Sequence, residues 1–74
     1  MEDKLKRYMS KRIQELMENN ELTPRELAHR CKTSERQIKR YLSGRFRDIG
    51  IRELKRLCRA FKVRFREFFS GYDG

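Results

Sequence analysis

Two helix start signals with a very short turn between them constrain the fold of this chain more than any other feature. The first, from Thr23 to Glu26, has a cap residue, a proline at the first helical position and a glutamate three residues after the cap. The second, from Ser34 to Gln37, repeats the capping-box pattern. Only Lys32 and Thr33 lie between the first predicted helix and Ser34, the cap of the second. A turn this short predicts two helices that meet at a large angle.

The predicted extents of these helices follow from their apolar residues. The first extends to about Cys31, and the second extends from Glu35 to about Ser43, where Gly44 ends it. Apolar side chains at steps of three and four predict the buried side of the second helix, which is Ile38, Tyr41 and Leu42. Its opposite side then carries Glu35, Arg36, Lys39, Arg40 and Ser43.

Helical periodicity also dominates the rest of the chain. We expect a helix from about Asp3 to Glu18, ended by Asn19 and Asn20, because its apolar residues recur at helical steps: Leu5, Tyr8, Met9, Ile13, Leu16 and Met17. A fourth helix is predicted from Ile51, Leu54, Leu57, Cys58 and Phe61, and a short fifth from Val63, Phe65, Phe68 and Phe69. The chain is therefore predicted to be all-α, with five helices in a single domain over residues 1–74 and a loose tail over 70–74.

The basic residues are concentrated in the second half of the chain. The net charge is +9, and from Arg36 to Arg66 there are twelve basic residues against two acidic ones, Asp48 and Glu53. This distribution predicts a partner of opposite charge, such as nucleic acid, an anionic membrane surface or an acidic protein. Phe46, which lies between Arg45 and Arg47, is either a lid on the core or an exposed contact for a partner.

Other functions find little support in the residues. Cys31 and Cys58 lack CxxC spacing and are interpreted as core thiols, and the single His29 offers no further metal ligands, so we expect no cofactor or metal. No nucleophile–base pair or glycine-rich phosphate loop is visible, and a domain this small has little room for a substrate cavity, so we expect no enzyme. No apolar run approaches the length of a membrane helix and no secretory leader is visible, which favours a cytoplasmic protein.

With these residues placed, the chain resembles the Cro and phage-repressor helix-turn-helix proteins, often called the XRE family. The resemblance covers about Ile13 to Phe69 and rests on the order and spacing of these residues: Leu22-Thr23, Glu26-Leu27-Ala28, Ser34, Ile38, Gly44, and the segment from Leu54 through Ala60-Phe61 and Val63 to Phe68. It implies a compact five-helix, lambda-repressor-like DNA-binding domain whose second and third helices form the motif.

The resemblance also implies roles for individual residues. The helix that begins near Glu35 would be the recognition helix, with base contacts from Glu35, Arg36, Lys39 and Arg40. Phosphate contacts would come from the start of the second helix and the loop after the third, at Thr23, Arg25, Ser43, Arg45 and Arg47. A guanidinium such as that of Arg36 can bond O6 and N7 of guanine together, whereas Glu35 can either accept from cytosine or complement its own helix N-terminus.

Three positions depart from the family pattern. Lys32 and Lys62 stand where the family usually has glycine, and a left-handed backbone at Lys32 would be strained by about 1 kcal/mol. Pro24 stands where a glutamine often contacts phosphate, so Arg25 is expected to replace that contact.

The function predicted from these features is sequence-specific binding of double-stranded DNA by a small, repressor-like transcriptional regulator. An alternative is an antitoxin that binds a toxin through its aromatic C-terminus and represses its own operon. A third is a structural or RNA-binding adaptor that uses the basic surface without reading bases. The cluster from Phe65 to Phe69 is either internal core or the contact of a homodimer on a palindromic operator.

Overall fold

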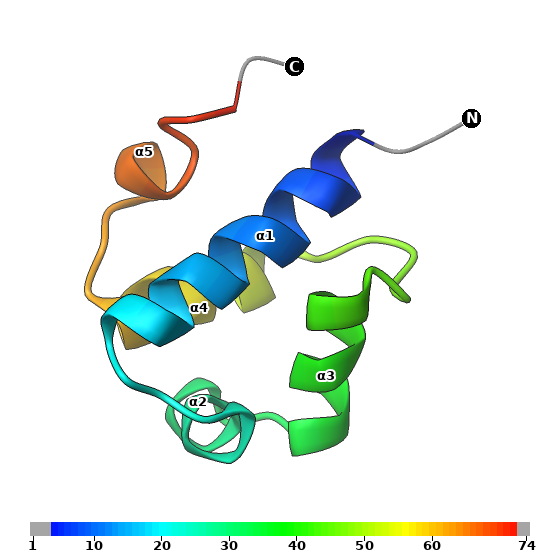
Figure 1. Ribbon diagram of the computed structural model, residues 1–74, viewed down its shortest axis with the longest axis vertical. Helices are drawn as coiled ribbons and strands as arrows, with labels where there is room; N and C mark the ends of the chain where they lie inside the picture. The colour runs from blue at the N-terminus through cyan, green and yellow to red at the C-terminus, as the bar shows by residue number, and fades with distance from the viewer. Residues whose placement is uncertain (1–3, 73–74) are drawn as a thin grey trace.

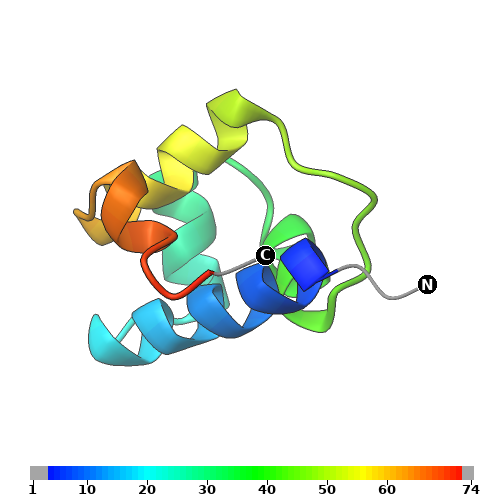
Figure 2. The same cartoon turned by 90° about the horizontal axis from the view of Figure 1, so that it is seen from above.

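Five helices and their connecting segments make up the computed structural model, which describes residues 4–72. Their bounds are α1 Lys4–Asn19, α2 Pro24–Cys31, α3 Glu35–Ser43, α4 Ile51–Phe61 and α5 Phe65–Phe68. In Figure 1, α1 crosses the front of the molecule, α4 lies behind it, and α2 and α3 occupy the lower part. Figure 2 shows the loop after α3 leading to the start of α4. The expected first residue of α1, Asp3, lies outside the described residues.

One apolar core lies between these helices, and α3 packs against both α1 and α2. Its fully buried side chains come from all five helices: Met9, Ile13, Leu27, Cys31, Ile38, Leu57 and Phe68. The predicted core cysteines are both buried free thiols. The predicted all-α, five-helix architecture is thus confirmed over the described residues.

Both predicted caps form, but only one is a complete capping box. The Thr23 hydroxyl accepts from the Glu26 N–H, and the Thr23 N–H donates to the Glu26 carboxylate at 2.9 Å. The Ser34 hydroxyl accepts from the Gln37 N–H at 3.1 Å, but no reciprocal bond from the Gln37 side chain is formed. The second capping box was therefore predicted wrongly: Ser34 caps α3 through its side chain alone.

Within residues 4–72, three residues other than glycine adopt positive φ, each where one helix turns toward the next. Lys32 has φ 54°, and its N–H bonds to the last carbonyls of α2, as expected for the turn between α2 and α3. Lys62 after α4 has φ 57°. After α1 the left-handed residue is Glu21 with φ 53°, rather than Asn19 or Asn20, which we expected to end this helix because asparagine tolerates that conformation. The side-chain amide of Asn20 instead donates to the carbonyl of Leu16 at 2.8 Å. Asn20 therefore satisfies a carbonyl in the last turn of α1.

Two ends of the predicted apolar faces are exposed rather than buried. Leu5 at the start of α1 is 37% exposed, and Ile51 at the start of α4 is 60% exposed. The first turn of each helix extends past the core, so periodicity alone overestimated the buried faces. On α5, Phe68 is fully buried while Phe65 is 41% exposed.

Side chains of α1 hold α5 and the segment after it. The Arg12 guanidinium donates to the carbonyls of Phe68 at 3.1 Å and Glu67 at 3.0 Å. The Tyr8 hydroxyl donates to the Phe68 carbonyl and accepts from the Gly71 N–H. Part of the tail that we expected to be loose, up to residue 72, therefore contacts α1, and residues 73–74 lie outside the described residues.

Candidate nucleic-acid interface

The exposed side of α3 is the centre of the candidate interface. Ser34 caps the start of this helix, and Gly44 ends it in a left-handed conformation with φ 76°. Ile38 and Tyr41 are buried at helical spacing, which fixes the rotation of the helix about its axis. The remaining side chains on the outer side are all exposed: Glu35, Arg36, Lys39, Arg40 and Ser43.

Contacts with α1 and with the following loop hold α3 in place. The Ser10 hydroxyl on α1 donates to the Tyr41 carbonyl at 2.6 Å. The ring of Phe46 meets the ring of Tyr41 edge to face, with centroids 5.2 Å apart. These contacts all involve the inner side of α3 and leave its outer side exposed.

The loop after α3 alternates between buried and exposed side chains. Phe46 is 8% exposed and covers the core, which decides between the two interpretations of this ring in favour of a lid. The Lys6 ammonium lies over its outer face, 5.9 Å from the centroid. Arg45 and Arg47, on either side of this anchor, are exposed. Because the Phe46 ring is buried, the side chains of its neighbours Arg45 and Arg47 extend to the surface.

The start of α2 adds a second group of polar atoms. Thr23 and Arg25 are exposed, and the Thr23 hydroxyl retains its proton for a further partner after accepting the capping bond. The hydrogen bonds from the Thr23 backbone and side chain hold the pKa of Glu26 below its ordinary value. That carboxylate stays charged at the helix N-terminus, where negative charge is favourable.

One ion pair lies on the outer side of α3. The Lys39 Nζ is 3.1 Å from the Glu35 Oε2, one helical turn apart. Within residues 4–72, no ion pair holds the guanidinium groups of Arg36, Arg40, Arg45 or Arg47. These arginines are therefore available to an anionic ligand without the loss of an existing pair.

The sequence-predicted site residues are only partly brought together. An open hollow of about 630 Å³ is lined by six residues, of which five belong to α3 and one to the loop: Glu35, Arg36, Lys39, Arg40, Ser43 and Arg45. Arg25 lines a neighbouring hollow beside α2, which Glu35 also lines. Thr23 and Arg47 line neither of these hollows.

Comparison with protein-family models gave one match over most of the chain. The model described as the Cro/C1-type HTH DNA-binding domain matches residues 12–73. The chain belongs to the Cro/C1-type helix-turn-helix family. The comparison with curated proteins and the comparison with solved structures each gave no match.

Membership in the Cro/C1-type family confirms the predicted resemblance and the lambda-repressor-like fold, with α2 and α3 as the helix-turn-helix. The chain is a DNA-binding domain of this family. Over residues 4–72, no helix has both the length and the apolar composition that a membrane crossing requires.

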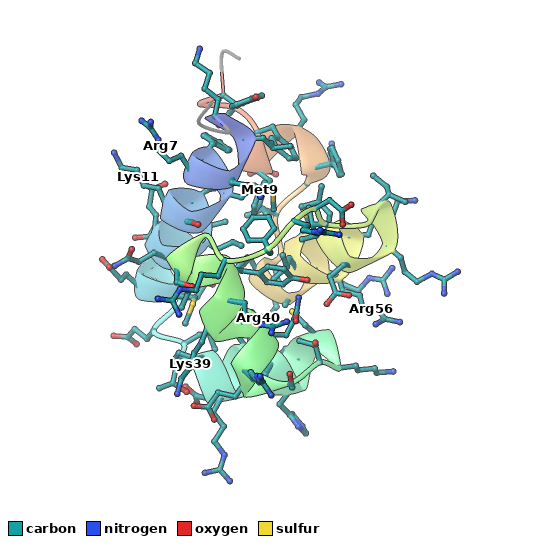
Figure 3. The ribbon with its side chains drawn as sticks, turned by 90° about the vertical axis from the view of Figure 1, so that its right-hand side faces the viewer. Arg7, Met9, Lys11, Lys39, Arg40 and Arg56 are labelled. Atoms are coloured by element: carbon teal, nitrogen blue, oxygen red, sulfur yellow. The ribbon has the colours of Figure 1, made fainter. Side chains whose placement is uncertain are left out.

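Sequence reasoning did not place the basic residues of α1 near this Cro/C1-type interface. Arg7 and Lys11 line a hollow of about 480 Å³ together with Leu42, Ser43 and Gly44 at the end of α3. Figure 3 shows both side chains extending outward from α1 on one side of α3, with Arg56 of α4 on the other. Their spacing of four residues shows that they share a face of α1, but only the packing of α1 against α3 brings them beside the helix-turn-helix.

Proposed function

We propose that this chain recognises a defined sequence in double-stranded DNA and acts as a small, repressor-like transcriptional regulator that occupies an operator. The observation that carries the proposal is the outer side of α3, where five neighbouring polar side chains are exposed on a helix fixed by its inner contacts. A helix of this kind fits the major groove of B-DNA.

The exposed residues of α3 are proposed to read bases. Arg36 has no ion-pair partner within the described residues, and its fork can bond O6 and N7 of one guanine. Arg40, one turn later, and Lys39 are proposed to contact base edges in the next steps of the groove. Glu35, which pairs with Lys39, is proposed to contact a cytosine amino group.

Residues at the two ends of the helix-turn-helix are proposed to hold phosphates. At the start of α2 these are the hydroxyl of Thr23 and the guanidinium of Arg25. After α3 they are Ser43, Arg45 and Arg47, the last two directed outward by the buried ring of Phe46. Phosphate contacts position the domain and supply affinity that is independent of sequence.

Two alanine variants test this division of labour. Arg36→Ala should cost about 1–3 kcal/mol on the operator and relax the preference at one base pair. Arg45→Ala should weaken binding to operator and scrambled duplexes alike, and should reduce the salt slope by about 1. Lys4→Ala, at the exposed start of α1, is the matched control for loss of one positive charge. Equal losses for both site variants on both duplexes would refute the proposed roles.

A second copy of the chain is the proposed partner on a palindromic operator. Phe65 on α5 is 41% exposed and lies 5.1 Å, centroid to centroid, from the partly buried Phe69. An antitoxin that binds a toxin through the same ring is the alternative. Sedimentation of the wild type and of Phe65→Gln, each with and without operator DNA, separates them: a dimer that Phe65→Gln abolishes supports the homodimer, and a monomer in all four samples opposes it.

A further inference from the structure

Four basic side chains form a row along the outer side of α4: Arg52, Lys55, Arg59 and Lys62. They follow one another at steps of three, four and three residues, which places them on one side of the helix and its C-cap. All four are exposed. We refer to this row as the α4 ridge.

The α4 ridge faces away from the core and from α2. Leu54, Leu57 and Phe61 turn another side of α4 into the core. A third side meets α2, where the Arg30 guanidinium donates to the Ala60 carbonyl at 3.5 Å and the Cys31 thiol lies 3.9 Å from the Arg56 carbonyl. The ridge lies on the remaining side of α4, which contacts neither the core nor α2.

The ridge also leads away from α3. Figures 1 and 2 show that α4 begins after the loop from α3 and extends toward the opposite end of the molecule, beside α5. A duplex against the exposed side of α3 therefore reaches the ridge only at its Arg52 end. The remaining three positive charges are not needed for the proposed operator contact.

Among the described residues, no ion pair holds a side chain of the ridge. The carboxylate of α4, Glu53, is on the inner side, where burial first and then its charge raise the pKa of the Cys31 thiol to about 11. The Glu67 carboxylate of α5 accepts from the Arg64 N–H at 3.2 Å. Like charges three and four residues apart repel each other along the whole ridge, and a bound polyanion relieves that repulsion.

We propose that the α4 ridge binds the phosphate backbone of a second DNA segment, so that one chain holds two duplexes. Its cations are about 4.5–6 Å apart along the helix at a rise of about 1.5 Å per residue. A DNA strand offers one phosphate per about 3.4 Å of its axis, so each cation has a phosphate within reach.

Phosphate is a better match than an acidic protein. Among the described residues, Ile51 is the one large exposed apolar side chain on α4, and it lies at the end of the ridge. Protein interfaces are built around buried aromatic or arginine anchors and are depleted in lysine at their centre. This inference goes beyond the proposed function, which uses α3 and the loops beside it.

The test uses three forms of the full chain. The ridge variant is Lys55→Gln, Arg59→Gln and Lys62→Gln together. The control variant is Lys4→Gln, Lys32→Gln and Arg66→Gln, which removes the same charge from three exposed positions outside the ridge and outside the hollows beside α3. Circular dichroism checks that each variant is folded. Binding to one labelled duplex is measured first, and capture of a second labelled duplex by protein on a tethered duplex is measured next, across salt concentrations.

The ridge variant should bind one duplex like the wild type but capture the second on the order of a hundredfold more weakly at ~0.1 M salt, with the salt slope of capture reduced by about 3. Capture at the wild-type level overturns the proposal, since two copies each holding one duplex through α3 would then suffice. Binding of polyglutamate by the same variants is measured in parallel. If the ridge variant keeps capture but loses polyglutamate, the ridge binds an acidic protein instead of DNA. If the ridge variant loses single-duplex binding as strongly as capture, the ridge belongs to the operator interface. If the control variant loses capture as strongly as the ridge variant, the effect is one of net charge. Either result also overturns the proposal. Arg36→Ala, which tests the proposed function, leaves capture of a scrambled second duplex unchanged.

Discussion

Replacing Lys32 by glycine should stabilise the chain, although the substitution removes a whole side chain. Lys32 has φ 54° and ψ 45° in the turn of the helix-turn-helix, and its side chain is exposed. A left-handed backbone costs an L-residue about 1–2 kcal/mol, whereas glycine adopts it freely. Glycine also makes the unfolded chain more flexible, which lowers the free energy of unfolding by about 0.5–1 kcal/mol. Relief of the strain outweighs this loss, so the free energy of unfolding should rise by about 0.5–1 kcal/mol. For a domain of this size, that gain raises the melting temperature by about 2–8 °C.

Matched lysine-to-glycine substitutions make this prediction specific to backbone conformation. Lys62→Gly, at φ 57° after α4, should stabilise by a similar amount. Lys11→Gly, at an exposed position in the middle of α1, should instead destabilise by about 0.5–1 kcal/mol, because glycine is a poor helix former. Lys32→Asn should be intermediate, since asparagine tolerates the left-handed region. Urea and thermal unfolding measure all four, and a Lys32→Gly variant that melts at or below the wild type would refute the strain assigned to this turn.

Three further outcomes follow from packing and protonation. Ser10→Ala removes the 2.6 Å bond to the Tyr41 carbonyl and should cost about 1 kcal/mol in urea unfolding; no change would mean that water replaces the bond without loss. Phe68→Ala should cost about 3–5 kcal/mol because the ring is fully buried, whereas Phe65→Ala on the same helix should cost less than about 1, and similar costs would contradict the burial described for α5. Because burial raises the pKa of Cys31 from 9.0 to about 11, the folded state binds more protons than the unfolded state between these values, so stability should fall as pH rises through that window; a Cys31→Ala variant should lose this part of the pH dependence.

The fold was largely predictable because its strongest signals are local. The caps at Thr23 and Ser34 depend on residues only three positions away, and both side-chain caps formed, although only the one at Thr23 is a complete capping box. The left-handed backbone at Lys32 was implied by the family resemblance, because the family usually has glycine at this position, and Lys32 does adopt φ 54°. The apolar periodicity of the sequence predicted the buried face of each helix correctly along the part of the helix that packs against the core.

The errors arose where tertiary contacts decide between local alternatives. Gln37 has the spacing of a capping box, but in the folded chain it makes no reciprocal bond to Ser34. Ile51 continues the apolar period of α4, yet the first turn of that helix extends past the core and leaves it 60% exposed.

The candidate site was predictable in part for the same reason. The exposed side of α3 is the complement of its buried side, so its members could be predicted from periodicity. The basic residues of α1 beside the end of α3 could not, because only the packing of two helices distant in sequence brings them there. The basic residues of the α4 ridge could be identified in the sequence, but the sequence did not show that the ridge faces away from α3.

Selection of bound duplexes from a random-sequence pool most directly tests whether α3 reads DNA. The wild-type chain should select a consensus, and Arg36→Ala should select the same consensus with the preference for guanine relaxed at one position. A wild-type pool without any consensus would contradict the proposed reading by α3 and would favour a basic adaptor that binds without reading bases.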